Sequence, residues 1–95
     1  REQLGEGFEE DIAQTTNYAY FLWRSVGDLE QAAAAARAAV KLPGNRYERV
    51  SAHITLASIL HAKGETAAAL EILHAAQSIR PRDTNVQRLL ARWTE

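Results

Sequence analysis

Three histidines are the side chains of this chain best suited to chemistry near neutral pH, because an imidazole can bind a metal or transfer a proton. His53 and His61 lie eight residues apart on one predicted helix, whereas two metal ligands on one helix face are typically about four residues apart. His74 follows Glu71 by three residues on another predicted helix. This spacing favours histidines on polar helix faces, so we expect no metal and no cofactor.

Other catalytic patterns are absent from the sequence. It contains no nucleophile motif, no glycine-rich phosphate loop, no His-Glu-x-x-His motif and no calcium-loop spacing. It also contains no cysteine, which excludes thiol chemistry and disulfides. We therefore expect a protein that is not an enzyme.

The charge of the chain argues against nucleic acid as a partner. The net charge is −1 and the pI is about 6.3, so no general attraction to phosphates is expected. The charges are nevertheless uneven: residues 1–31 hold two basic and seven acidic side chains, and residues 32–95 hold nine basic and five acidic ones. We interpret this uneven distribution as ordinary surface charge. The alternative interpretation is that the acidic end of one copy contacts the basic end of another.

Targeting signals give little information about location. No apolar run approaches the roughly 20 residues that span a bilayer, so membrane insertion is not expected. The chain starts at Arg1 and has no methionine, and we expect a piece of a longer protein. Its location stays open between the cytoplasm, by default, and the periplasm. The preference for arginine and alanine hints at a bacterial source.

Two segments of the chain repeat one pattern. Residues 23–32 and 60–69 each contain a large apolar residue, a glycine four places later, an acidic residue after it and an alanine five beyond the glycine. Gly27 and Gly64 are 37 residues apart, and periods of about 20–50 residues are typical of stacked repeats. A glycine followed by an acidic residue suits a helix end and the cap of the next helix. Both glycines are therefore predicted to lie at the turns of helical hairpins.

Apolar periodicity and caps predict five helices. The first covers about 8–26, and the second runs from the cap at Asp28, with Gln31 completing a capping box, to about Lys41. The third covers about 46–63 behind an Asn45–Glu48 capping box. The fourth runs from Gly64-Glu65-Thr66 to Pro81. The last helix follows a cap at Asp83 or Thr84. The alanines of residues 32–39 are expected to allow close helix packing.

These residues resemble the tetratricopeptide repeat (TPR) family. The match is close in the second unit, at Leu56, Ala57, Leu60, Gly64, Ala69, Leu73, Ala76 and Pro81, and looser in the first, where Tyr20 and Ala36 depart from the pattern. The resemblance implies an all-α fold of helix-turn-helix repeats stacked as a short right-handed solenoid of five helices. Residues 1–7 are expected to be a linker or the tail of a preceding element. Residues 8–95 are expected to form the domain, with repeats at about 13–45 and 46–82 and a capping helix at about 83–94.

In TPR proteins the first helix of each pair lines a concave groove that holds a partner. The resemblance therefore implies a non-catalytic scaffold that binds a peptide or protein segment. The expected groove residues come from the first unit, the second unit and the last helix: Gln14, Asn17, Phe21, Arg24, Ser51, Ile54, Ser58, His61, Asn85, Arg88 and Arg92.

One subclass of the family binds chaperone carboxylates through a clamp of lysines, arginines and asparagines. The corresponding positions here hold Asn17, Phe21, Thr55, Asn85 and Leu89, so the clamp is missing. Two alternatives to peptide binding stay open. One is head-to-tail self-association, in which the acidic aromatic first helix of one copy meets the basic last helix of another. The other is a regulatory appendage of an enzyme that lies outside these residues.

Overall fold

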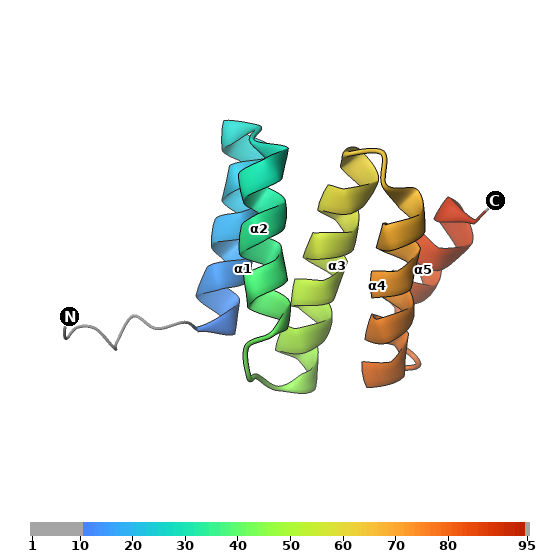
Figure 1. The fold of residues 1–95 in the computed structure, drawn as a ribbon. Helices are drawn as coiled ribbons and strands as arrows, with labels where there is room; N and C mark the ends of the chain where they lie inside the picture. The colour runs from blue at the N-terminus through green and yellow to red at the C-terminus, as the bar shows by residue number, and fades with distance from the viewer. Residues whose placement is uncertain (1–10, 95) are drawn as a thin grey trace.

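The computed structural model describes residues 11–94, and this part of the chain is all-α with no strand. Its helices are α1 (Ile12–Phe21), α2 (Leu29–Val40), α3 (Arg46–Ala62), α4 (Thr66–Ile79) and α5 (Thr84–Trp93), and α1 continues into a π-helical turn, η2 (Leu22–Val26). Figure 1 shows α1 and α2 as one antiparallel hairpin, α3 and α4 as a second beside it, and α5 against the second. The prediction of an all-α fold with five helices is confirmed.

Asp11 begins the first hairpin. Its backbone is extended and its carboxylate accepts the N–H groups of Ala13 and Gln14 at 2.8 and 3.3 Å, which satisfies donors that a helix start leaves free. The described helix therefore begins at Ile12, and the start predicted at about Phe8, like the predicted linker 1–7, lies outside the described residues.

The turn after α1 differs from a regular helix end. The Leu22 carbonyl accepts the N–H groups of both Gly27, at 2.8 Å, and Asp28, at 3.0 Å, and the first of these bonds spans five residues and so defines the π turn. In the second hairpin the matching acceptor is Leu60, which receives the Glu65 N–H at 2.9 Å. The acceptor in the first hairpin thus lies one residue further from its glycine than Leu60 does from Gly64.

Gly27 and Gly64 are the left-handed residues of the two turns, with φ of 83° and 89°. Both predictions are confirmed, because a left-handed residue at this position ends the helix and lets its last carbonyls bond. At Gly64 the N–H donates to the His61 carbonyl at 3.0 Å. Together with the Glu65 bond to Leu60, this is a Schellman motif.

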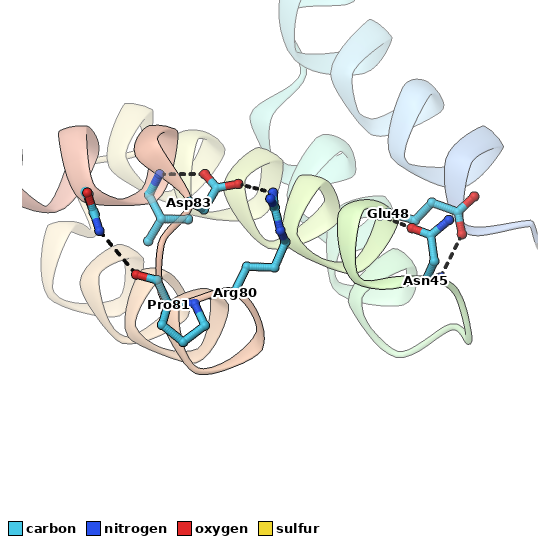
Figure 2. Close-up of polar contacts among 7 residues, drawn as sticks. Asn45, Glu48, Arg80, Pro81 and Asp83 are labelled. Atoms are coloured by element: carbon cyan, nitrogen blue, oxygen red, sulfur yellow. Dashed lines mark hydrogen bonds and ion pairs between the residues drawn. The ribbon is translucent and has the colours of Figure 1, made fainter.

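The caps of the hairpins follow the prediction in part. The Asn45–Glu48 capping box is present in both directions, and Figure 2 draws it at the start of α3. Asp28 caps α2, but the Gln31 side chain donates to its carboxylate at 3.0 Å instead of accepting its backbone N–H. The predicted reciprocal box is wrong there because that N–H is already bonded to Leu22.

The acidic residue after the second glycine does not cap α4. Glu65 precedes the helix with no side-chain cap bond, because the longer side chain of glutamate suits this position less well than that of aspartate. Its carboxylate lies 3.5 Å from the Lys63 ammonium, which is also 3.0 Å from Glu30 of the first hairpin. The hydrogen bond that the Lys63 ammonium donates to the Glu30 carboxylate is the main cause that raises the pKa of Lys63, against a lowering by desolvation. Lys63 thereby links the two hairpins.

One hydrophobic core joins both hairpins. Ala32, Ala33 and Ala36 of α2 are fully buried and belong to one cluster with large side chains of η2, α3 and α4, among them Leu22, Leu56 and Leu73. Alanine removes little side-chain entropy and lets helices approach closely, so the alanine tract has the packing role predicted for it. Trp23 and Trp93 lie at the edge of this core, half-buried.

Candidate functional site

A stripe of side chains along α3 borders three clefts in the surface. Tyr47, Ser51, Ile54, Ser58 and His61 are spaced three or four residues apart, which places them on one face of the helix. Each lines at least one of three clefts that lie between α3 and either α1–η2 or α5. No residue of α2 or α4 lines these three clefts. We call this surface the groove.

The first two clefts meet at the start of α3. One, of about 210 Å³, lies between Thr16 and Asn17 of α1 and Tyr47 and Ser51 of α3. The other, of about 300 Å³, is again lined by Tyr47 and Ser51 and reaches Asn85 at the start of α5. Because Tyr47 and Ser51 line both, the two clefts adjoin each other across α3, and we call them together the depression.

Arg80 shapes the outer edge of this depression. Its guanidinium lies over the Tyr47 ring, 4.1 Å from the centroid, and donates to the Asp83 carboxylate at 2.6 Å. The other oxygen of Asp83 accepts the Val86 N–H at 3.0 Å and caps α5. Figure 2 shows Arg80 reaching from the end of α4 toward Asp83. One arginine thus links the start of α5 to the start of α3.

The third cleft lies at the other end of α3 and has a volume of about 440 Å³. We call it the two-tryptophan cleft. The residues that matter for its chemistry come from η2, α3 and α5: Trp23, Arg24, Ser58, His61, Arg92 and Trp93.

Aromatic contacts hold the walls of this cleft. The His61 ring stacks on Trp93, with centroids 4.2 Å apart and planes inclined by 14°. On the opposite wall, Tyr20 meets Trp23 edge-on at 5.6 Å and the Arg24 guanidinium lies 5.2 Å from the Trp23 ring centroid. Stacked and edge-on pairs are the favoured aromatic arrangements. Both tryptophans also pack on the hydrophobic core, so the cleft has firm walls.

The structure gathers most of the predicted groove residues. The following line one or more of the three clefts: Asn17, Arg24, Ser51, Ile54, Ser58, His61, Asn85 and Arg92. Gln14, Phe21 and Arg88 are exposed but line none of them. Phe21 follows Asn17 by four residues and yet remains 51% exposed.

Three aromatic residues of the groove were not among those predicted. Tyr47 could have been found, because it lies one helical turn before Ser51 on the same face. The sequence carries no signal for Trp93, because its pairing with His61 depends on how α5 packs. Trp23 was assigned to the repeat pattern. Trp23 lies within the π turn η2, and no local pattern in the sequence predicts that turn.

The charges of the groove are mainly positive. Among the described residues that line the two-tryptophan cleft, Arg24 and Arg92 are the basic side chains with a permanent charge, and none is a carboxylate. At the other end, Glu48 belongs to the capping box and Asp83 is paired with Arg80. The groove is therefore suited to a ligand with negative charge.

Within residues 11–94, no three histidine or acidic side chains lie close enough together to hold a metal ion. Among the helices of the same part of the chain, none has the length and apolar character needed to cross a membrane. Comparison of the chain with protein-family models, with curated proteins and with solved structures finds no match in any of the three.

Proposed function

We propose that this chain is a non-catalytic, TPR-like interaction domain that binds a peptide segment in the groove. One observation carries the proposal: the Tyr47–His61 stripe of α3 runs through three clefts between the first helices of the hairpins and the last helix. A surface of this shape fits an extended or helical peptide, with apolar contacts at Ile54 and polar contacts at Ser51 and Ser58.

The groove is tested by filling it. Ser51 is exposed and lines two of the clefts, so Ser51→Arg puts a long side chain into the groove without burying a new group. Peptides selected from a random display library on the unmodified domain should bind Ser51→Arg at least about tenfold more weakly, a loss of roughly 1.4 kcal/mol.

Ser78→Arg is the matched control. Ser78 is also exposed and helical, but it lies on α4, which lines none of the three clefts. This variant should bind the selected peptides as the unmodified domain does. A library that yields no binder, or binders equally tight to Ser51→Arg, would exclude the groove.

Self-association is a second candidate, favoured by aromatic side chains exposed on the first helix. Tyr18, Tyr20 and Phe21 are each about half exposed, at 53%, 52% and 51%. Large exposed aromatics often mark contact surfaces, and the acidic N-terminal and basic C-terminal parts of the chain would attract each other in a head-to-tail contact. Such a contact repeats into rings or filaments.

Light scattering over a concentration series, at low and high salt, separates the two candidates. A mass that grows with concentration and falls with salt supports head-to-tail assembly, because salt screens exposed charges. A monomer at every concentration excludes it.

A further inference from the structure

We propose that the two-tryptophan cleft binds an aromatic side chain of an acidic peptide, with Arg24 and Arg92 pairing with carboxylates beside that side chain. The inference rests on the proposed function and names the chemistry of the ligand at one end of the groove.

The aromatic walls provide the first argument. Trp23 on η2 and Trp93 on α5 both line the cleft and are both half-buried against the core. Each therefore presents ring surface that is fixed in place before a ligand arrives, which reduces the entropy lost on binding. The volume of about 440 Å³ lies in the usual range of ligand pockets, about 300–1,000 Å³. Rigid aromatic pockets of this kind typically dominate the binding energy of an interface.

The two arginines provide the second argument. Arg24 is held over the Trp23 ring and Arg92 lies in the last turn of α5, so basic groups stand on both the η2 side and the α5 side of the cleft. The ion pairs formed among residues 11–94 involve Lys63 and Arg80 and neither of these arginines. A guanidinium has a planar set of donors that matches a carboxylate. Carboxylates next to the bound aromatic side chain would complement both groups.

A peptide fits the surroundings of the cleft better than a nucleic acid does. Aromatic rings with arginines also suit stacked bases, but single strands need a basic path along the whole backbone. From the cleft toward the start of α3, the stripe continues over Ser58, Ile54 and Ser51, which carry no charge. These side chains suit the amides and apolar groups of a polypeptide.

The cleft contains its own reporter, because Trp23 and Trp93 are the only tryptophans of the chain. Tryptophan emission of the full chain is followed while acetyl-Asp-Glu-Phe-Glu-Asp-amide is added. We expect a saturable change. The same peptide with alanine in place of phenylalanine, or with amides in place of the carboxylates, should bind at least about tenfold more weakly.

Charge variants complete the test. Arg24→Gln and Arg92→Gln should each weaken binding of the acidic peptide about fivefold or more and reduce its salt dependence. Arg37→Gln removes another exposed arginine, on α2, which lines no part of the groove, and should leave binding of the acidic peptide unchanged. All these residues are exposed, so circular dichroism should show unaltered folding.

Any one of four results would overturn the inference. The first is no saturable change up to about 1 mM peptide, a binding energy near −4 kcal/mol. The second is equal binding to both arginine variants and the unmodified chain. The third is a saturable change with oligothymidylate and none with the peptide. The fourth is that library peptides bind Ser51→Arg weakly but bind Arg24→Gln and Arg92→Gln as tightly as the unmodified chain. In that case the groove would remain the proposed binding surface, and only the assignment of its ligand would be refuted.

Discussion

Replacing Gly64 by alanine measures how much the left-handed backbone conformation of this turn costs, in unfolding free energy, when the residue is not glycine. Gly64 has φ of 89°, and a Cβ added there meets no atom within 4 Å. Steric clash therefore contributes nothing, and only the backbone conformation opposes the substitution. A left-handed conformation costs an L-residue about 1–2 kcal/mol. Alanine offsets about 0.4–1 kcal/mol of this cost, because it lowers the conformational entropy of the unfolded chain. The expected net loss of stability is about 1 kcal/mol.

Urea denaturation followed by circular dichroism measures this loss. For a chain of this size the midpoint should fall by about 0.5–1 M urea, and Tm by roughly 4–8 °C. Gly64→Asn should recover part of the loss, because asparagine tolerates the left-handed conformation better than alanine. If Gly64→Ala costs less than about 0.3 kcal/mol, or if asparagine is no better than alanine, the turn does not need a left-handed residue and the reasoning fails.

Three further substitutions test the packing and electrostatics of the fold. Gly44→Ala should destabilise by about 1–3 kcal/mol, because its Cβ would lie 2.8 Å from side-chain atoms of Ile12 and Glu48; unchanged urea stability would contradict this contact. Leu73→Ala should cost about 2–5 kcal/mol, since Leu73 is fully buried, and a loss below about 1 kcal/mol would argue against its place in the core. Lys63, whose pKa is raised above its ordinary value of 10.5, contributes stability that is complete below that pH and is lost as the pH rises through the raised pKa. The unfolding free energy of the unmodified chain should therefore exceed that of Lys63→Met by less in alkali than at neutral pH. A difference that does not change with pH would refute the stabilising contact between Lys63 and Glu30.

Local features of the sequence were sufficient to predict most of the helices. Gly27 and Gly64 predict the two turns, and Asp28, Asn45 and Asp83 predict three helix starts. These rules work because a helix end involves only the few residues that bond to its free N–H and carbonyl groups. Where a rule failed, at Glu65, a side chain longer by one methylene group left the N-cap unused and contacted Lys63 instead.

The groove could be predicted only in outline. A helical period is enough to place Ser51, Ile54, Ser58 and His61 on one face of α3, since the positions of residues three and four apart on a helix are set by its geometry. Which helices border that face came from the family resemblance, and eight of the predicted residues do line the clefts.

What only the tertiary structure decided is the chemistry at the two ends of the groove. The stacking of Trp93 on His61 and of Arg80 on Tyr47 joins residues from different helices, and such pairs depend on the angles and distances at which helices pack. The π turn that accompanies Trp23 and Arg24 in the cleft depends on one carbonyl, that of Leu22, accepting the N–H groups of both Gly27 and Asp28. Leu22 is itself buried in the core that joins both hairpins, and burial is a property of the whole fold that no local pattern of residues specifies.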